Sequence, residues 1–335
     1  MQLVAYGSQD VYLTGNPQIT FWKVVYRRHT NFALEAVRQD FNGTAKAHGN
    51  VVATISRNGD LIHKAYLVVQ TNGASTCVAD LIKTVELEIG GQQIDKHYGE
   101  WMDVWNDLSC PTGKKNGWDQ MVKVGNGGTA YIPLEFFFCT NPGLALPLIA
   151  LQYHEVRIKF TLGGMVEENG ASLWVDYVYL DTDERRRMAQ SSHEFLITQL
   201  QQQEETSSNA RLNFNHPVKE LVWKNHTLDS NGDPDKPDSI KLTLNGHDRM
   251  APRDWKYFNK VQPYQHHTNI PSDSTIGVYS FALKPEDSQP SGSCNFSRID
   301  NAQLSVSNAN DLTIWATNWN VLRIMSGMGG LAYSN

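Results

Sequence analysis

The amino-acid sequence predicts an all-β protein made of two tandem eight-stranded antiparallel jelly rolls, a double jelly roll with short helices in its loops. Three observations support this fold class. Short segments of strand-forming residues dominate the chain, helical periodicity is scarce, and the order of segments in the first half recurs in the second. Many short strands separated by turn residues are typical of sandwiches and barrels rather than of alternating strands and helices.

The candidate strands are rich in β-branched and aromatic residues and are bounded by Gly, Asn, Pro and Asp. In "TVELEIGG", the apolar residues Val85, Leu87 and Ile89 alternate with Glu86 and Glu88, which is the pattern of a strand with one buried face. Similar segments are "ITFWKVVY", "NVVATI", "KAYLVVQ", "EVRIKFTL" and "LWVDYVYL".

Two short helices are expected, one in "YGEWMDVWNDL" and one in "DTDERRRMAQ". In the second segment, Asp181 or Asp183 would accept hydrogen bonds from the free N–H groups of the first turn. The basic run "DERRR" is interpreted as a short solvated helix with ion pairs near the junction of the two halves, in preference to a nucleic-acid patch.

A faint internal repeat indicates how the two halves correspond. The segment "LIKTVELEIGGQQID" precedes the aromatic "HYGEWMDVWN", as "SIKLTLNGHDR" precedes "DWKYFNKVQP", with an offset of roughly 145–155 residues. Between the halves, residues 199–210 are polar and are expected to form a linker. The predicted organisation is an N-terminal arm over residues 1–20, a first jelly roll over 21–198 and a second over 211–335.

Composition limits the possible functions. The chain is 40% hydrophobic and 19% charged, as in a soluble globular protein, and its net charge of −6 gives no global basic field, so direct nucleic-acid binding is not expected. The start lacks the features of a signal peptide, and the longest apolar run, "LALPLIAL", is too short to span a membrane. The four dispersed cysteines indicate neither a zinc module nor a disulfide scaffold and favour a reducing compartment.

The histidine pair in "QPYQHHTNIPSD" is the most conspicuous candidate for chemistry. In an extended chain His266 and His267 point to opposite faces, and no metal-binding spacing surrounds them. Pro263 and Pro271 bracket the pair, which is typical of a loop. A structural role is therefore expected, and no metal site is predicted.

Other short patterns also have structural interpretations. "GMGGLA" lacks the following helix of a dinucleotide site, so its glycines are expected to let the last strand or tail pack closely against backbone or a neighbouring subunit. Glu86 and Glu88 resemble the carboxylate pair of a jelly-roll hydrolase, but exposed strand charges are commoner. No nucleophile motif is present in the sequence, so no catalytic residue, cofactor or enzyme activity is expected.

Long blocks of the chain resemble the major capsid proteins of nucleocytoplasmic large DNA viruses, especially those of algae. The blocks occur in the family's order from residue 2 to residue 335 and include "QLVAYGSQDVYLTGNPQITFWKVVYRRHTNFA", "VELEIGGQQIDKHYGEWM", "NPGLALPLIALQYHEVRI", "DERRRMAQSSHEFLI", "VQPYQHHTNIP" and "NVLRIMSGMGGLAYSN". The resemblance implies a double jelly roll, in agreement with the repeat.

The resemblance also implies a function and partners. The expected role is a structural major capsid protein, made and assembled in the host cytoplasm, whose homotrimeric pseudo-hexameric capsomers tile the icosahedral outer shell of a virion. Its partners would be neighbouring capsomers, minor capsid proteins and an internal viral membrane. The alternative from another class is a glycan-binding jelly-roll module, a lectin or host-attachment protein.

Three groups of candidate residues follow. In the resembling family the N-terminus faces the virion interior, so Lys23, Arg27 and Arg28 would contact a membrane or minor capsid proteins, or would equally be strand-edge charges that prevent unwanted pairing. The sequons place candidate glycosylation at Asn225, Asn42 and Asn295, with Asn225 favoured because it is expected in a polar loop. The candidate aromatic residues for a trimer interface are Trp101, Trp105, Trp255, Tyr257, Phe258 and Tyr264.

Overall fold

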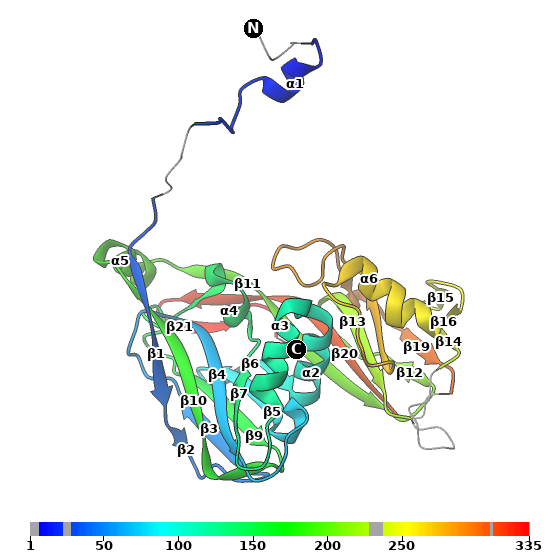
Figure 1. The fold of residues 1–335 in the computed structure, drawn as a ribbon, viewed down its shortest axis with the longest axis horizontal. Coiled ribbons are helices and arrows are strands. Elements are labelled where there is room, and N and C mark those ends of the chain that lie inside the picture. Colours follow the sequence, from blue (N-terminus) through cyan, green and yellow to red (C-terminus); the bar gives the residue numbers. More distant parts are fainter. Residues whose placement is uncertain (1–6, 23–27, 228–236, 309–310, 335) are drawn as a thin grey trace.

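The computed structural model describes residues 7–22, 28–227, 237–308 and 311–334. Two β-sandwiches lie side by side, and the N-terminal segment extends away from the first of them (Figure 1). Each sandwich consists of two antiparallel sheets, so the described residues form four sheets in total. No helix in this described part of the chain is long and apolar enough to cross a membrane.

The first sandwich contains two five-stranded sheets. One sheet has the order β1-β10-β4-β7, with β8 also paired to β4: β1 (Phe32–Gln39), β10 (Val166–Leu180), β4 (Leu61–Thr71), β7 (Thr129–Pro133) and β8 (Leu146–Pro147). The other has the order β2-β3-β9-β5-β6: β2 (Phe41–Asn42), β3 (Asn50–Thr54), β9 (Val156–Leu162), β5 (Ile82–Ile89) and β6 (Gln92–Tyr98).

The second sandwich contains a six-stranded and a five-stranded sheet. The larger has the order β11-β20-β13-β17, with two short additions: β11 (His193–Glu205), β20 (Leu312–Met325), β13 (Pro217–Asn225), β17 (Ile276–Ser280), β18 (Cys294–Asn295) and β21 (Met328–Leu331). The smaller contains β12 (Asn209–Arg211), β19 (Ala302–Val306), β14 (Ser239–Leu244), β15 (His247–Asp248) and β16 (Arg253–Asp254).

The two sandwiches correspond strand by strand. The order β1-β10-β4-β7 of the first is matched by β11-β20-β13-β17 of the second, and β8 and β18 occupy the same place beside β4 and β13. In the opposite sheets, β3-β9-β5-β6 is matched by β12-β19-β14-β15. The predicted double jelly roll is confirmed, although short segments such as β8 and β18 raise the strand number above eight in each unit.

The helices lie in the loops between strands. They are α1 (Asp10–Thr14), α2 (Gly99–Ser109), α3 (Thr112–Val122), α4 (Phe137–Thr140), α5 (Thr182–Gln190) and α6 (Gln262–His266), with the single turns η1 (Val78–Asp80), η2 (Pro142–Leu144) and η4 (Phe296–Arg298) and the π-helical η3 (Tyr257–Val261). The sequence predicted α2 and α5. In α5, the Asp181 side chain accepts a hydrogen bond from the Thr182 N–H at 2.8 Å, and Arg185 pairs with the buried Asp60 at 2.9 Å.

Helices α1, α3, α4 and α6 were not predicted, and for α3 and α6 the sequence shows why. Helix α3 contains Gly113 and Gly117, which lower its intrinsic helix propensity. The segment Gln262–His266 was expected to be a loop because of its prolines, and this expectation is wrong. Pro263 lies in the first turn of α6, where a missing N–H costs little, and η3 precedes α6 directly.

The expected linker over residues 199–210 is instead occupied by β11 and β12. Strand β11 pairs with β20 along its whole length, from His193 opposite Ile324 to Glu205 opposite Leu312. Polar side chains of this strand donate hydrogen bonds to main-chain oxygens. The Gln201 amide, for example, donates to Asn215 O at 2.8 Å. A polar strand of this kind lacks the apolar alternation by which strands are recognised in a sequence.

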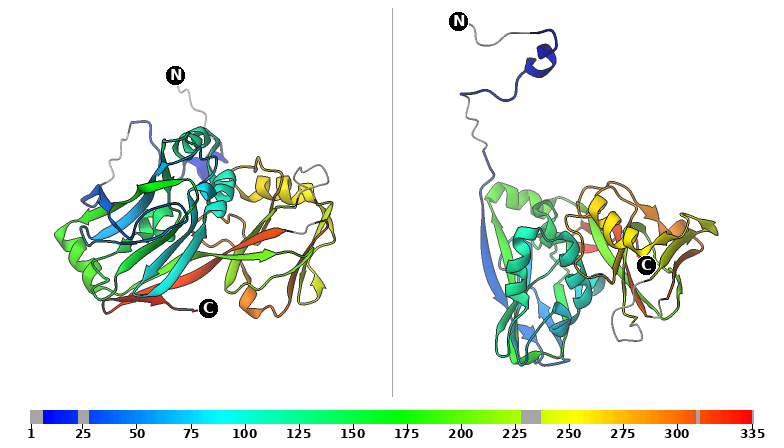
Figure 2. Two further views of the ribbon diagram at one scale, coloured as in Figure 1. Left: turned by 90° about the horizontal axis from the view of Figure 1, so that it is seen from below. Right: turned by 45° about the vertical axis from the view of Figure 1, so that its right-hand side comes forward.

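The β11–β20 pair runs from one sandwich to the other. Ile197, Leu322 and Ile324 are buried in the core of the first sandwich, although their strands belong to a sheet of the second. Figure 2 shows β20 and β21, in red, reaching back along the first sandwich. The two units are therefore joined by shared strands as well as by surface contact.

Candidate functional site

Helix α2 of the first sandwich packs against the outer face of the β13–β17–β20 sheet of the second. Its residues Trp101, Val104 and Leu108 lie on one side of the helix and share a buried apolar cluster with Val222 and Trp315. The Trp101 ring lies 5.7 Å from the Trp315 ring, measured between centroids. We call this contact between the two jelly rolls the seam.

Ion pairs and hydrogen bonds to main-chain N–H groups flank the apolar part of the seam. Asp107 on α2 accepts a hydrogen bond from the Ser272 N–H at 2.7 Å and forms an ion pair with Lys115. Burial alone would raise the pKa of Asp107, but Lys115 and these donors hold it below its usual value. A second ion pair joins Lys224 of β13 to Glu100 of α2 at 3.3 Å.

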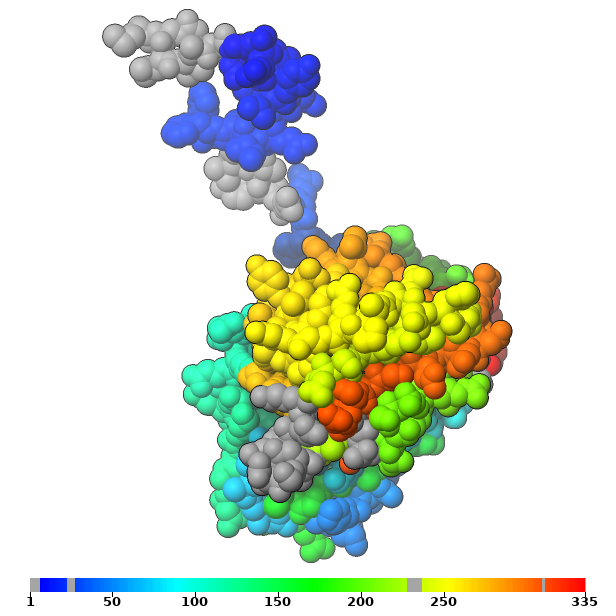
Figure 3. Space-filling model, turned by 90° about the vertical axis from the view of Figure 1, so that its right-hand side faces the viewer, coloured from blue at the N-terminus to red at the C-terminus, as the bar shows by residue number. Residues whose placement is uncertain are grey.

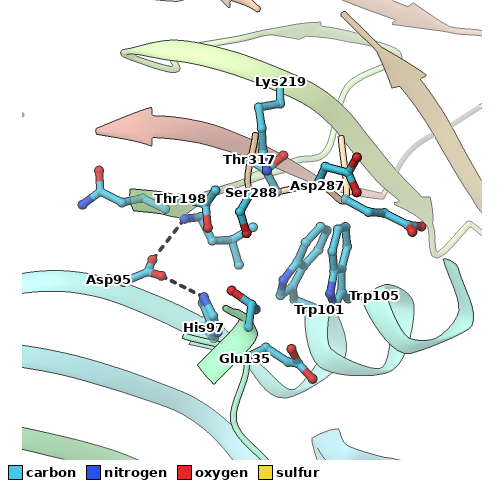
Figure 4. Close-up of a pocket in the computed structure, with 14 residues that line it drawn as sticks. Asp95, His97, Trp101, Trp105, Glu135, Thr198, Lys219, Asp287, Ser288 and Thr317 are labelled. Atoms are coloured by element: carbon cyan, nitrogen blue, oxygen red, sulfur yellow. Dashed lines mark hydrogen bonds and ion pairs between the residues drawn. The ribbon is translucent and has the colours of Figure 1, made fainter. Parts of the chain in front are cut away.

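A cavity of about 60 Å³ lies at the seam beside the stacked rings of Trp101 and Trp105. Figure 4 shows Lys219 on one side of it and His97 and Glu135 on the other. Ligand pockets usually measure roughly 300–1,000 Å³, so this cavity has room for a few waters and not for a sugar or a nucleotide.

Three charged or titratable groups around this cavity, Asp95, His97 and Lys219, are buried and bonded to other protein groups. Asp95 binds the His97 Nε2 at 2.9 Å and accepts the Leu200 N–H of β11 at 3.0 Å. Lys219 donates to Pro285 O at 2.8 Å, and burial lowers the pKa of its ammonium group. Burial also raises the pKa of the Glu135 carboxyl. The bond between Asp95 of β6 and Leu200 of β11 connects the two sandwiches.

His267 lies at the centre of a second buried network. Its Nε2 is 2.9 Å from Glu220 Oε2 and its Nδ1 is 3.0 Å from Glu286 Oε1. Burial alone would lower the pKa of His267, but the two carboxylates outweigh burial and raise it to about 9. The imidazolium therefore carries a charge at neutral pH and joins β13 to the segment that follows β17.

His266 has a separate partner: its Nδ1 lies 3.1 Å from Leu283 O. The two histidines do not converge on one point. Among the residues that the structure describes, no group of three or more His, Cys, Asp or Glu side chains is arranged to hold a metal ion.

The other chemical candidates of the sequence are bonded within the strands. Glu86 pairs with Lys96 at 2.8 Å, and Glu88 pairs with Lys159 across β5 and β9. The glycines of "GMGGLA" form the β20–β21 hairpin: a Cβ on Gly329 would lie 2.7 Å from the Leu151 side chain. Both groups have a structural role, but Glu88 is only 8% exposed, so the expectation of an exposed strand charge is wrong for it.

Three of the six aromatic residues that were predicted to contact a neighbouring chain are internal. Trp101, Trp255 and Phe258 are 4%, 6% and 1% exposed, so the prediction is wrong for them because their surfaces are already covered by this chain. Trp105 and Tyr257 are half-buried. Tyr264 is 76% exposed on α6, and its contact with another chain stays a prediction.

The three sequons differ in accessibility. Asn225 is the last residue of β13 and is 1% exposed, so the expected polar loop is not found there and its preference as a glycosylation site is wrong. Asn42 and Asn295 are exposed, and both stay predictions. The Asn295 side chain accepts the Ser297 N–H at 3.1 Å.

The N-terminal segment makes little contact with the sandwiches. Helix α1 buries none of its residues, and Phe21 and Trp22 are 97% and 85% exposed. Residues 7–22 thus form an arm, and its ordering by partner molecules stays a prediction. Of the three basic candidates, Arg28 is exposed, whereas Lys23 and Arg27 lie outside the described residues.

Two sandwiches of one topology, joined by the seam, define the class of double jelly-roll proteins. Comparison with known proteins supports this class. A family model for the N-terminus of major capsid proteins matches residues 20–181, and a model for the major capsid protein of large eukaryotic DNA viruses matches residues 184–330. The chain belongs to this family of viral major capsid proteins.

Individual relatives match over the whole chain. The major capsid protein of Pyramimonas orientalis virus is 52% identical, with 100% of this chain and 99% of the relative covered. That of Paramecium bursaria Chlorella virus 1 is 44% identical with the same coverage. The chain is thus a structural protein that self-associates into the icosahedral capsid of a large DNA virus, and it is not an enzyme.

Solved structures show the same fold. A chain of the PBCV-1 virus capsid superposes with a TM-score of 0.85 at 40% identity, covering 94% of this chain and 100% of that one. The Faustovirus major capsid protein gives a TM-score of 0.76 at 12% identity, covering 96% and 94%. At this low identity the second likeness concerns the fold alone.

Proposed function

We propose that three copies of this chain form a homotrimeric capsomer with a pseudo-hexameric outline, and that such capsomers tile the icosahedral shell. The observation that carries the proposal is the strand-by-strand correspondence of the two sandwiches. Two similar units per chain, repeated by a three-fold axis, place six similar units around one centre. A trimer of this kind fits a hexagonal lattice although its true symmetry is three-fold.

The seam supports this proposal because it fixes the angle between the two units. Apolar packing by Trp101 and Trp315, the Glu100–Lys224 ion pair and the shared β11–β20 strands together oppose movement of one sandwich against the other. A shell subunit needs such rigidity, because a variable angle between the two sandwiches would remove the regular arrangement of six similar units around the axis.

Electron microscopy of the purified oligomer tests the proposal. Averaged projections along the symmetry axis are expected to show six lobes of similar size around one centre, because each chain contributes two sandwiches. Particles with three lobes, or with two-fold symmetry, would contradict the pseudo-hexameric arrangement. Hexagonal arrays on the grid at higher protein concentration are expected as well.

A further inference from the structure

We propose that the contact between chains repeats the contact within a chain: the exposed face of η3–α6 docks on the outer face of the β4–β7–β10 sheet of a second copy. This inference rests on the proposed homotrimer and names the two surfaces that would form it. It follows from the strand correspondence and from two apolar surfaces that face solvent in the single chain.

The seam provides the template for this contact. Helix α2 lies between β6 and β7 in the chain and covers the outer face of the β13–β17–β20 sheet through Trp101, Val104 and Leu108. In that sheet, Val222 on β13 is opposite both Val278 on β17 and Trp315 on β20. All three side chains are fully buried beneath α2.

The strand correspondence between the two sandwiches identifies the counterparts of α2 and of the sheet on which α2 packs. Because β6 and β7 correspond to β15 and β17, the counterpart of α2 is the helical segment η3–α6, which lies between β15 and β17. By the same order, β13, β17 and β20 correspond to β4, β7 and β10. If the six units are related by similar rotations, η3–α6 of one chain meets the β4–β7–β10 sheet of the next.

The helical segment has an unoccupied apolar face. Phe258 and Gln262 point into their own sandwich, whereas Val261 is 40% exposed and Tyr264 is 76% exposed. A spacing of three residues places Val261 and Tyr264 side by side on the helix surface. Figure 3 shows this part of the chain, in yellow, at the surface on the upper part of the face towards the viewer.

The sheet has a complementary hollow on its outer face. A cavity of about 510 Å³ is lined by Tyr66, Met121 and Tyr131, among other residues, and Met121 and Tyr131 are 37% and 45% exposed. Tyr66 stacks on its cross-strand neighbour Trp174, with ring centroids 6.4 Å apart and planes 4° apart. This pair occupies the place of Val222 and Trp315, but it is only half-buried, whereas Val222 and Trp315 are fully buried beneath α2.

The two surfaces lie on different sandwiches, with η3–α6 on the second and the β4–β7–β10 sheet on the first (Figure 1). A contact between two different surfaces is heterologous, so it either closes into a ring or continues as a filament. Six similar units around one axis close the ring after three chains. The proposed contact therefore accounts for a trimer and not for a dimer.

Variants on each surface test the assignment. Tyr264→Asp combined with Val261→Asp alters the helix surface, and Tyr131→Asp alters the sheet surface. Each introduces a charge into an apolar contact, so the native mass by light scattering is expected to fall from about 113 kDa for three chains of 37.7 kDa towards that of one chain. The matched control is Tyr153→Asp, because Tyr153 is 75% exposed and lies on neither surface, and this variant is expected to stay trimeric.

Mixing the two surface variants gives a second readout. Each variant retains the surface that the other has lost, so a mixture is expected to form one intact contact and to reach the mass of two chains, about 75 kDa from 37.7 kDa each. Circular dichroism at the start confirms that each variant is folded. Surface variants that remain trimeric, or a mixture no heavier than its components, would overturn the inference while leaving the trimer in place. A monomeric wild-type protein would instead overturn the proposed function.

Discussion

At the scale of single residues, His267 shows how much of the structure depends on partners that are distant in the sequence. Its side chain is 0% exposed between Glu220 of β13 and Glu286 beyond β17. The sequence predicted a structural role for the histidine pair, but no local pattern marks either glutamate as a partner. The three side chains meet only because the β13–β17 pairing and α6 bring their segments together.

The charge of His267 makes the stability of the chain sensitive to high pH. Its pKa in the folded chain, about 9, lies above the usual value of 6.5, so the ion pairs stabilise the fold fully below pH 6.5 and are lost as pH rises through about 9. We expect His267→Gln to lower the free energy of unfolding at pH 7 by roughly 3–5 kcal/mol, because the buried Glu220 and the partly buried Glu286 lose their partner.

Chemical denaturation at pH 7 and pH 10 checks this expectation. The wild-type protein and the control His266→Gln are expected to lose more stability over this interval than His267→Gln, which has already lost the ion pairs. If all three proteins lose stability in parallel, His267 is not the group responsible.

The aromatic residues show a second limit on what the sequence can predict at the scale of single residues. Their clustering in "HYGEWMDVWN" and "DWKYFNKVQP" predicts large buried contacts, but it does not tell which surfaces meet. Trp101 is covered by the second sandwich of its own chain, and Phe258 by the core of its own sandwich. Aromatic composition is the same for a contact within a chain and a contact between chains.

At the scale of elements, α2 was predictable because its apolar residues recur at helical spacing, whereas β11 was not, because its polar side chains conceal a strand. Helix α2 belongs to the first sandwich but is buried against the second. It therefore contributes to the stability of the chain as a whole.

Trp101→Ala tests the contribution of α2. Removing this 4% exposed ring leaves a cavity at the seam, and we expect the free energy of unfolding to fall by about 3–5 kcal/mol. Trp22→Ala, which removes an 85% exposed ring from the arm, is expected to change it by less than about 0.5 kcal/mol. Both are measured by urea denaturation at one protein concentration. Equal effects of the two changes would contradict the assignment of Trp101 to the seam.

At the scale of the whole molecule, the internal repeat allowed the double jelly roll to be predicted, because both halves carry the same order of strands, turns and aromatic segments. The position of one sandwich against the other was not predictable. It depends on side chains such as Asp107 and Ser272, which are separated by more than a hundred residues and show no shared pattern in the sequence. The same correspondence that fixes the fold also leads to the proposed contact between chains.

The native mass of the purified protein, measured by light scattering after gel filtration and repeated on dilution, tests the central claim most directly. The account predicts about 113 kDa, three chains of 37.7 kDa each, with no change on dilution, because each chain contributes two surfaces to a closed ring. A stable monomer of 37.7 kDa would contradict it.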